Sequence, residues 1–285
     1  MTLLEKRSER LHAGLSSTLA YLGREISPKR VHRLRTTIRR IESLITFAEP
    51  EIGKKQEKAL EQLALLRKRA GRVRDLDVQL SLLGAIGNTS TARDRKLLAD
   101  VLKQKRSKHT ERLSAVVAKS KEQRFRPIFD AIRAQSAAAP KLLDESAEPL
   151  ERAKRTVTQL ATDFSSPAKA KAGALHEIRI SLKKTRYLAE LGEESAEQKA
   201  FLVAMKSVQD SLGAWHDWEE LTKTAEKEFG GRVNCPLLVE VRALFAAKRS
   251  AAAAAVSNLF AAWQSAPWRK PAAGVYPPQT LAQRA

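Results

Sequence analysis

The sequence predicts an all-α protein. Apolar residues recur at three- and four-residue intervals along almost all of its 285 residues, which is the spacing that brings side chains to one face of a helix. A sustained two-residue alternation with β-branched enrichment, the pattern of strands, does not occur. Aromatic residues make up 5% of the chain and there are only 12 glycines, which argues against a turn-rich sandwich or barrel.

Proline and glycine divide this pattern into a series of expected helices. These helices cover about residues 2–24, 28–48, 53–86, 91–119, 125–136, 146–164, 168–192, 197–229 and 236–264. Residues 267–285 contain four prolines and little apolar periodicity, so we expect a loosely docked or disordered tail with no assigned function.

An internal repeat organises the chain. The segment VHRLRTTIRR (31–40) aligns without a gap on LHEIRISLKK (175–184), histidine on histidine. Further on, GRVRD (71–75) aligns on GAWHD (213–217) at nearly the same offset. Two such matches indicate a duplication. The predicted helical repeats cover residues 1–145 and 146–266.

The charge balance indicates an anionic partner. The 52 Lys and Arg against 32 Asp and Glu leave a net charge of +20, far more than solubility requires, and most of the excess lies before residue 146. A single cysteine, Cys235, excludes an internal disulfide and suits a reducing compartment. The sequence shows neither a signal peptide nor an apolar stretch of the roughly 20 residues that span a bilayer, so we expect a cytoplasmic protein without membrane contact.

Two of the expected helices carry cations on the face opposite their apolar row. At about 100° per residue, a cationic stripe in residues 28–48 lies across the helix from Leu34, Ile38 and Ile41. The stripe consists of His32, Arg35 and Arg39, and its counterpart in the second repeat consists of His176, Arg179, Lys183 and Arg186. A solvated face would explain one such helix. Two copies that are nearly free of acids favour anion binding, since solvated faces normally mix both signs.

Other polar residues have simpler interpretations. Arg67 and Arg74 lie one heptad apart beside an apolar row and are expected to line a cleft, whereas Arg69 and Arg72 point outward. The basic run from Lys103 to Arg112 is interpreted as a solvated face.

Gly71 and Gly213 are expected to permit close helix approach. Asp75, Asp77 and Asp217 are too few for a metal or catalytic centre, so we interpret them as structural ion pairs or packing contacts.

These landmarks resemble the CHAD family, the conserved histidine α-helical domain. The residues that carry the resemblance are VHRLR (31–35) with Arg39 and Arg40, GRVRDLDV (71–78), LHEIR (175–179) with Lys183, Lys184, Arg186 and Tyr187, and VQDSLG (208–213) with Asp217. They span roughly residues 2–265. One departure is His216, where the second copy more often has asparagine.

The resemblance implies two four-helix bundles related by a pseudo-twofold axis, with a basic channel between them that binds inorganic polyphosphate. Two rows of cations would face each other there, His32, Arg35, Arg39 and Arg40 against His176, Arg179, Lys183, Lys184 and Arg186. Members are also associated with polyphosphate granules in bacteria, so granule proteins become expected partners.

The expected function is therefore non-catalytic polyphosphate binding, with no metal or cofactor. Some relatives carry a hydrolase module marked by Glu-x-Glu-x-Lys, which this sequence lacks, as it lacks a Gly-x-x-x-x-Gly-Lys phosphate loop. Protonation of histidine should raise the affinity as the pH falls toward about 6.5. The alternative is nucleic-acid binding, although no aromatic residue interleaves with the cations of 31–40 and only Tyr187 does so in the second copy.

Overall fold

The computed structural model describes residues 1–138, 148–164 and 172–265. The breaks predicted at Ala139–Pro140 and at 165–167, and the predicted tail 267–285, lie outside these ranges. The helices are α1 (Leu3–Arg24), α2 (Pro28–Ala48), α3 (Lys54–Ala85), α4 (Ala92–Ala118), α5 (Arg126–Ala138), α6 (Glu148–Asp163), α7 (Ala172–Ala189), α8 (Ala196–Phe229) and α9 (Pro236–Ser265). Two 3₁₀ turns, Thr89–Thr91 and Glu122–Arg124, flank α4.

The prediction of an all-α protein is confirmed, and every expected helix is present with its ends within a few residues of the expected positions. The described ranges contain no strand. Local sequence explains the ends of α2, which begins at Pro28, where a proline lacks a backbone N–H that the helix would leave unpaired. It ends at Glu49 in the left-handed conformation, with φ of 45°, directly before Pro50.

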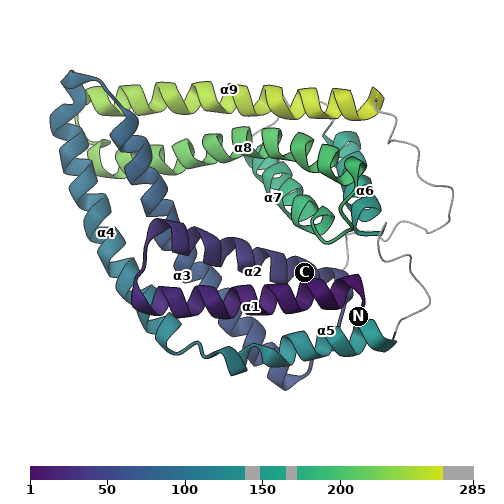
Figure 1. Ribbon diagram of the computed structural model, residues 1–285. Coiled ribbons are helices and arrows are strands. Elements are labelled where there is room, and N and C mark those ends of the chain that lie inside the picture. Colours follow the sequence, from purple (N-terminus) through teal and green to yellow (C-terminus); the bar gives the residue numbers. More distant parts are fainter. Residues whose placement is uncertain (139–147, 165–171, 266–285) are drawn as a thin grey trace.

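Figure 1 shows the arrangement of the helices. The helices α1, α2 and α5 lie together in the lower part, α8 and α9 run side by side along the top, and α6 and α7 lie beside them. The long pair α3 and α4 climbs along the left edge and joins the lower group to the upper one. In both halves of the chain two shorter helices precede a long packed pair. The duplication and its pseudo-twofold axis stay predictions.

Two hydrophobic cores correspond to the two halves of the chain. The first is built by α1, α2, α3, α4 and α5, and α5 contributes the fully buried Ile128 and Ile132. The first half therefore has a fifth helix, which packs against α1, α2 and α3. The second core is built by α6, α7, α8 and α9, and Trp215 lies fully buried in it.

A third core is shared between the halves. It joins the upper ends of α3 and α4, through side chains such as Leu98 and Leu102, to Leu221 and Trp218 of α8 and Leu237 of α9. Because neither half buries these side chains alone, the two helical groups are held in one arrangement. None of the helices in the described part of the chain combines the length and apolar character needed to cross a membrane.

Candidate anion-binding site

The cationic stripes of the two halves meet where α2 packs against α7 and α3 packs against α8. The apolar rows behind them are buried as predicted, with Leu34, Ile38 and Ile178 fully inaccessible to solvent. Two buried glutamines of α8 fix the position of α7. Gln209 donates to the Leu182 carbonyl at 2.7 Å, and Gln198 donates to the Ala189 carbonyl at 2.8 Å at the end of α7.

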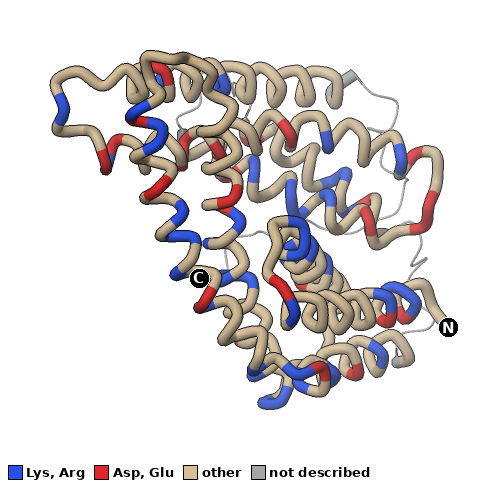
Figure 2. The backbone as a smooth tube through the Cα atoms, turned by 60° about the vertical axis from the view of Figure 1, so that its left-hand side comes forward, with Lys and Arg blue, Asp and Glu red and all other residues tan. Residues whose placement is uncertain are grey.

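Seven of the predicted site residues form one group, which we name the central cluster. Its members are His32, Arg35 and Arg39 on α2, Arg74 on α3, and Arg179, Lys183 and Arg186 on α7. Lys and Arg positions of several helices gather near the centre of Figure 2. Basic residues from both halves of the chain thus lie within electrostatic reach of one another.

The protonation of the cluster reflects its burial and its density of like charge. Burial, with Arg179 and Arg35 adding repulsion against the opposing attraction of Asp217, lowers the pKa of Lys183 to about 8. Burial also lowers the pKa of Arg179. The pKa of His32 falls below its ordinary value through burial and then through the charges of Arg74 and Arg35. We therefore expect protonation of His32, and the gain in affinity that it would give, only below pH 6.5.

Two guanidinium donors of the cluster make no hydrogen bond to any residue that the structure describes. The Nε atoms of Arg179 and Arg186 are buried and make no hydrogen bond within the described ranges. Buried donors are almost always satisfied in folded proteins, and a guanidinium is suited to anionic oxygen atoms. A bound oxyanion would satisfy them.

Carboxylates enter the cluster from neighbouring helices. Asp75 accepts from Arg35 Nη1 at 3.0 Å, which confirms the interpretation of Asp75 as an ion-pair residue. Glu42 lies between Arg39, at 3.3 Å, and Arg67, at 2.6 Å. Burial raises the pKa of Asp217, while Arg179 and Lys183 act in the opposite direction. The cluster is a set of cations with built-in counterions.

The remaining predicted residues lie at the edges. Arg67 contacts the cluster through Glu42, which it shares with Arg39. Lys184 is exposed and follows Lys183 by about 100° around α7. His176 is exposed, and its ring centroid lies 5.7 Å from that of His216.

Arg40 belongs to a different opening. It pairs with Glu190 at 2.7 Å and lines a cavity of about 480 Å³ between α1, α2, α7 and α8, together with Arg10, Arg33, Tyr187 and Lys199. Glu190 also lies 3.8 Å from Arg186. This carboxylate therefore stands between the cavity and the central cluster.

The expectation for the glycines was wrong. A Cβ atom added at Gly71 or Gly213 would meet nothing within 4 Å, so neither residue is needed for close helix approach. Each glycine lies one helical turn before an aspartate of the site, Asp75 or Asp217. They leave open space on that face of α3 and α8.

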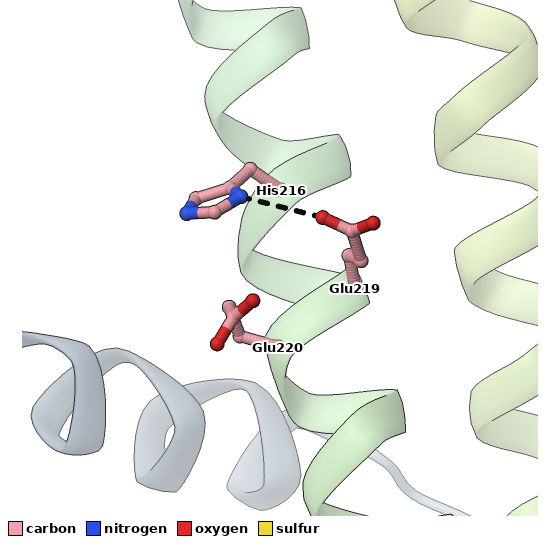
Figure 3. A group of neighbouring side chains, drawn as sticks. All are labelled: His216, Glu219 and Glu220. Atoms are coloured by element: carbon pink, nitrogen blue, oxygen red, sulfur yellow. Dashed lines mark ion pairs between the residues drawn. The ribbon is translucent and has the colours of Figure 1, made fainter. Parts of the chain in front are cut away.

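One group of potential metal ligands occurs in the described ranges, His216, Glu219 and Glu220 on α8 (Figure 3). Their ligand atoms lie within 4.8 Å of one another, and His216 Nδ1 is 3.5 Å from Glu219. Lys223 pairs with Glu219 at 3.5 Å and with Glu220 at 3.0 Å. Burial and the charge of Arg179 lower the pKa of His216 to about 4, so this ring is neutral near pH 7. We interpret the two carboxylates as ion-pair partners of Lys223, with a neutral His216 beside them.

Comparison with known protein families shows to which family the chain belongs. The sequence profile of the CHAD domain matches residues 9–226. The chain belongs to the CHAD family. Among solved structures, the CHAD domain from the plant Ricinus communis is similar, with a TM-score of 0.66 and 19% identity over 91% of each chain. PptA from Streptomyces chartreusis is similar at a TM-score of 0.64 and 20% identity, over 92% of this chain and 98% of that one. A search of curated proteins finds no match.

The match places both His-x-x-Arg helices, α2 and α7, inside the CHAD region. Two acids of the site, Glu42 and Glu190, were not among the residues predicted from the sequence. A signal exists for Glu42, which follows Arg39 by three residues. Glu190 follows Arg186 by four residues, which signals that pair, but the sequence gives no signal for its pairing with Arg40, which is 150 residues away.

Proposed function

We propose that this CHAD protein binds inorganic polyphosphate without catalysis, with the central cluster as the floor of a basic channel between the two halves. The observation that carries the proposal is the meeting of seven basic side chains from both halves of the chain around the Nε atoms of Arg179 and Arg186, which are buried without a hydrogen bond to the described part of the chain. A linear chain of identical anionic groups needs only cations at intervals along its path, and arginine forks and lysine point charges supply them.

The chemistry of the site favours polyphosphate over nucleic acid. Base recognition draws on exposed aromatic platforms or on polar side chains that read base edges. The aromatic side chain beside the cluster, Tyr187, is buried, and Arg186 covers its ring at 4.9 Å. One face of its ring is thus covered by Arg186, which favours phosphate contacts as the main source of affinity.

Two carboxylates beside the central cluster support a non-catalytic role. Asp75 and Glu42 are each held in an ion pair with a cluster arginine. A general base or a set of metal ligands would need carboxylates that are free to take up a proton or a cation. As part of the same proposal, the protein is cytoplasmic and collects at polyphosphate granules.

A competition titration tests the proposal. A fluorescent long-chain polyphosphate is bound to the protein at fixed salt and is displaced by unlabelled polyphosphate, by single-stranded DNA or by duplex DNA. We expect polyphosphate to compete best at equal phosphate concentration, and we expect no phosphate release with Mg²⁺ or Mn²⁺. Stronger competition by either DNA, or turnover that scales with protein, would show that the proposal is wrong.

A further inference from the structure

A second group of cations lies on the α3–α4 pair, and the central cluster does not include it. Arg69 and Arg72 on α3 come together with His109 and Arg112 on α4, and we name these four residues the α3–α4 cluster. The two helices run side by side along the left of Figure 1. Burial, then the charges of Arg112, Arg72 and Arg69, lower the pKa of His109, which places all three arginines within electrostatic reach of its ring.

The α3–α4 cluster faces away from the central cluster. With Arg67 set at zero on α3, Arg74 lies at about 340°, whereas Arg72 and Arg69 lie at about 140° and 200°. Arg67 and Arg74 contact the site side of α3, so Arg69 and Arg72 occupy the opposite face. On α4, Lys105 and Lys108 share an arc of about 100° with His109 and Arg112. The cationic surface therefore extends along α4.

The composition of this surface differs from that of the central cluster. All the charges that act on His109 are positive, whereas the central cluster contains Asp75 and Asp217. Of the acids on or near α4, Asp77 pairs with Arg106 at 2.5 Å and Asp100 with Lys103 at 3.7 Å. Glu111 precedes Arg112 in the sequence and accepts a hydrogen bond from Ser107 at 3.5 Å. The like charges of the α3–α4 cluster repel one another, and folding gains nothing from them.

Buried polar atoms at the same place also lack partners. Arg69 Nε and His109 Nδ1 are buried and make no hydrogen bond within the described part of the chain. Arg69 and His109 are half-buried, while Arg72 and Arg112 are exposed. The surface thus combines inner nitrogen atoms without partners and outer guanidinium groups that are open to solvent.

We propose that the α3–α4 cluster is a second oxyanion site, which holds phosphate groups of a second polyphosphate chain on the side of α3 opposite the central cluster. The choice of ligand rests on the proposed function. The two sites would let one protein bridge two chains and so condense polyphosphate. The arginine forks would bind phosphoryl oxygen atoms, and the neutral imidazole of His109 would donate its one N–H.

The sequence of the hairpin argues against stacking on large aromatic rings as the source of affinity. Residues 54–118, which contain α3 and α4, include no Phe, Tyr or Trp. Proteins that bind single strands without sequence preference stack bases on such rings. A ligand consisting of phosphate groups alone fits this surface better than a nucleic acid does.

The test uses the full-length protein and a triple variant, Arg69→Ala, Arg72→Ala and Arg112→Ala. Calorimetric titration with tripolyphosphate should give two sites per wild-type protein and one in the variant. Long-chain polyphosphate should form scattering particles with the wild type at intermediate mixing ratios, and the variant should lose this scattering. The matched control removes three exposed lysines of α3 that belong to neither cluster, Lys54→Ala, Lys55→Ala and Lys58→Ala, and should retain two sites.

Further readouts separate this proposal from the function on which it rests. The triple variant without ligand should melt at a higher temperature than the wild type, because it has lost like-charge repulsion, and tripolyphosphate should raise its melting temperature less. A double variant of the central cluster, Arg179→Ala with Lys183→Ala, should lose the other site and keep this one. One tripolyphosphate per wild-type protein, with an unchanged stoichiometry in the triple variant, would overturn the second site and leave the central one standing. The second site would also be overturned if only the double variant lost a tripolyphosphate site and the triple variant still formed scattering particles.

Discussion

Asp75 holds Arg35 across the gap between α3 and α2, with its carboxylate oxygen 3.0 Å from the guanidinium. The Arg35 side chain is 29% exposed and that of Asp75 is 50% exposed, so water and salt screen the pair. An anion that binds Arg35 must compete with this carboxylate and must also approach its negative charge. Asp75 is therefore an internal competitor of the ligand.

Replacing Asp75 by asparagine should strengthen polyphosphate binding. Exposed ion pairs contribute about 0.2 to 1 kcal/mol, so removing the competitor should raise the affinity up to about fivefold. Fluorescence titration at fixed salt measures the change. Asp130→Asn removes an exposed carboxylate of α5, 4.0 Å from Arg126, and should have no effect. Weaker binding by Asp75→Asn would mean that the carboxylate positions Arg35 for the ligand and does not compete with it.

Lys183 should couple binding to proton uptake near pH 8. Its pKa is lowered to about 8, and a bound phosphate group favours the protonated form, so the pKa of Lys183 rises in the complex. Affinity should then be fully present below pH 8 and should fall as the pH rises through and above it. Calorimetry at pH 8 in two buffers of different ionisation enthalpy measures the protons taken up.

The matched variant for this experiment is Lys183→Arg. Arginine keeps its charge throughout this range, so the variant should bind with little proton uptake and with an affinity that no longer falls between pH 8 and 9. Equal proton uptake by the wild type and this variant would assign the titration to another group.

The sequence was sufficient to predict the helices and to predict which face of each helix is apolar and which is cationic. Leu34 and Ile38 recur at helical spacing, so the cations between them must lie on the other side, and the packing of α2 keeps that geometry. The sequence could not predict which acids would meet those cations. Glu190 reaches Arg40 through the packing of α7 on α2, and this pairing depends on tertiary structure that helical spacing does not encode.

The α3–α4 cluster shows the same limit of prediction from sequence. Arg69 and Arg72 were expected to point outward, and the run around His109 was interpreted as a solvated face. Each expectation concerned one helix. The packing of α3 on α4 brings both sets together into one dense group of basic side chains.

Charge removal on either half should weaken polyphosphate binding if the central cluster is one composite site. We compare Arg35→Ala with Arg39→Ala against Arg179→Ala with Lys183→Ala, and expect each pair to lower the affinity markedly. Each lost charged hydrogen bond is worth about 1.5 to 3 kcal/mol. The Arg179 pair should have the larger effect, because burial strengthens its interactions with an anion.

Salt titration gives a second measure of the composite site. Each lost phosphate contact should flatten the log-log dependence of affinity on salt by about 0.7 to 0.9, the value for nucleic acids. Lys54→Ala with Lys55→Ala is the charge-matched control, and circular dichroism checks helicity. A full effect from one pair and none from the other would assign the site to one half of the chain.

The shared third core predicts that the two halves unfold together. Leu98 of α4 is fully buried against side chains of α8 and α9, whereas its neighbour Leu97 is 42% exposed. Leu98→Ala should lower the free energy of unfolding by about 2 to 5 kcal/mol, the usual range for a buried leucine, and Leu97→Ala should change it little. All four tryptophans lie at or beyond residue 215; Trp215 and Trp263 are buried in the second core and report on the second half, whereas Trp218 lies in the shared core. A substitution in the first half should therefore shift the fluorescence transition and the circular dichroism transition by the same amount. If Leu98→Ala moved part of the dichroism signal and left the tryptophan transition in place, the halves would be independent folding units, and the relative positions of α2 and α7 would need another source of rigidity.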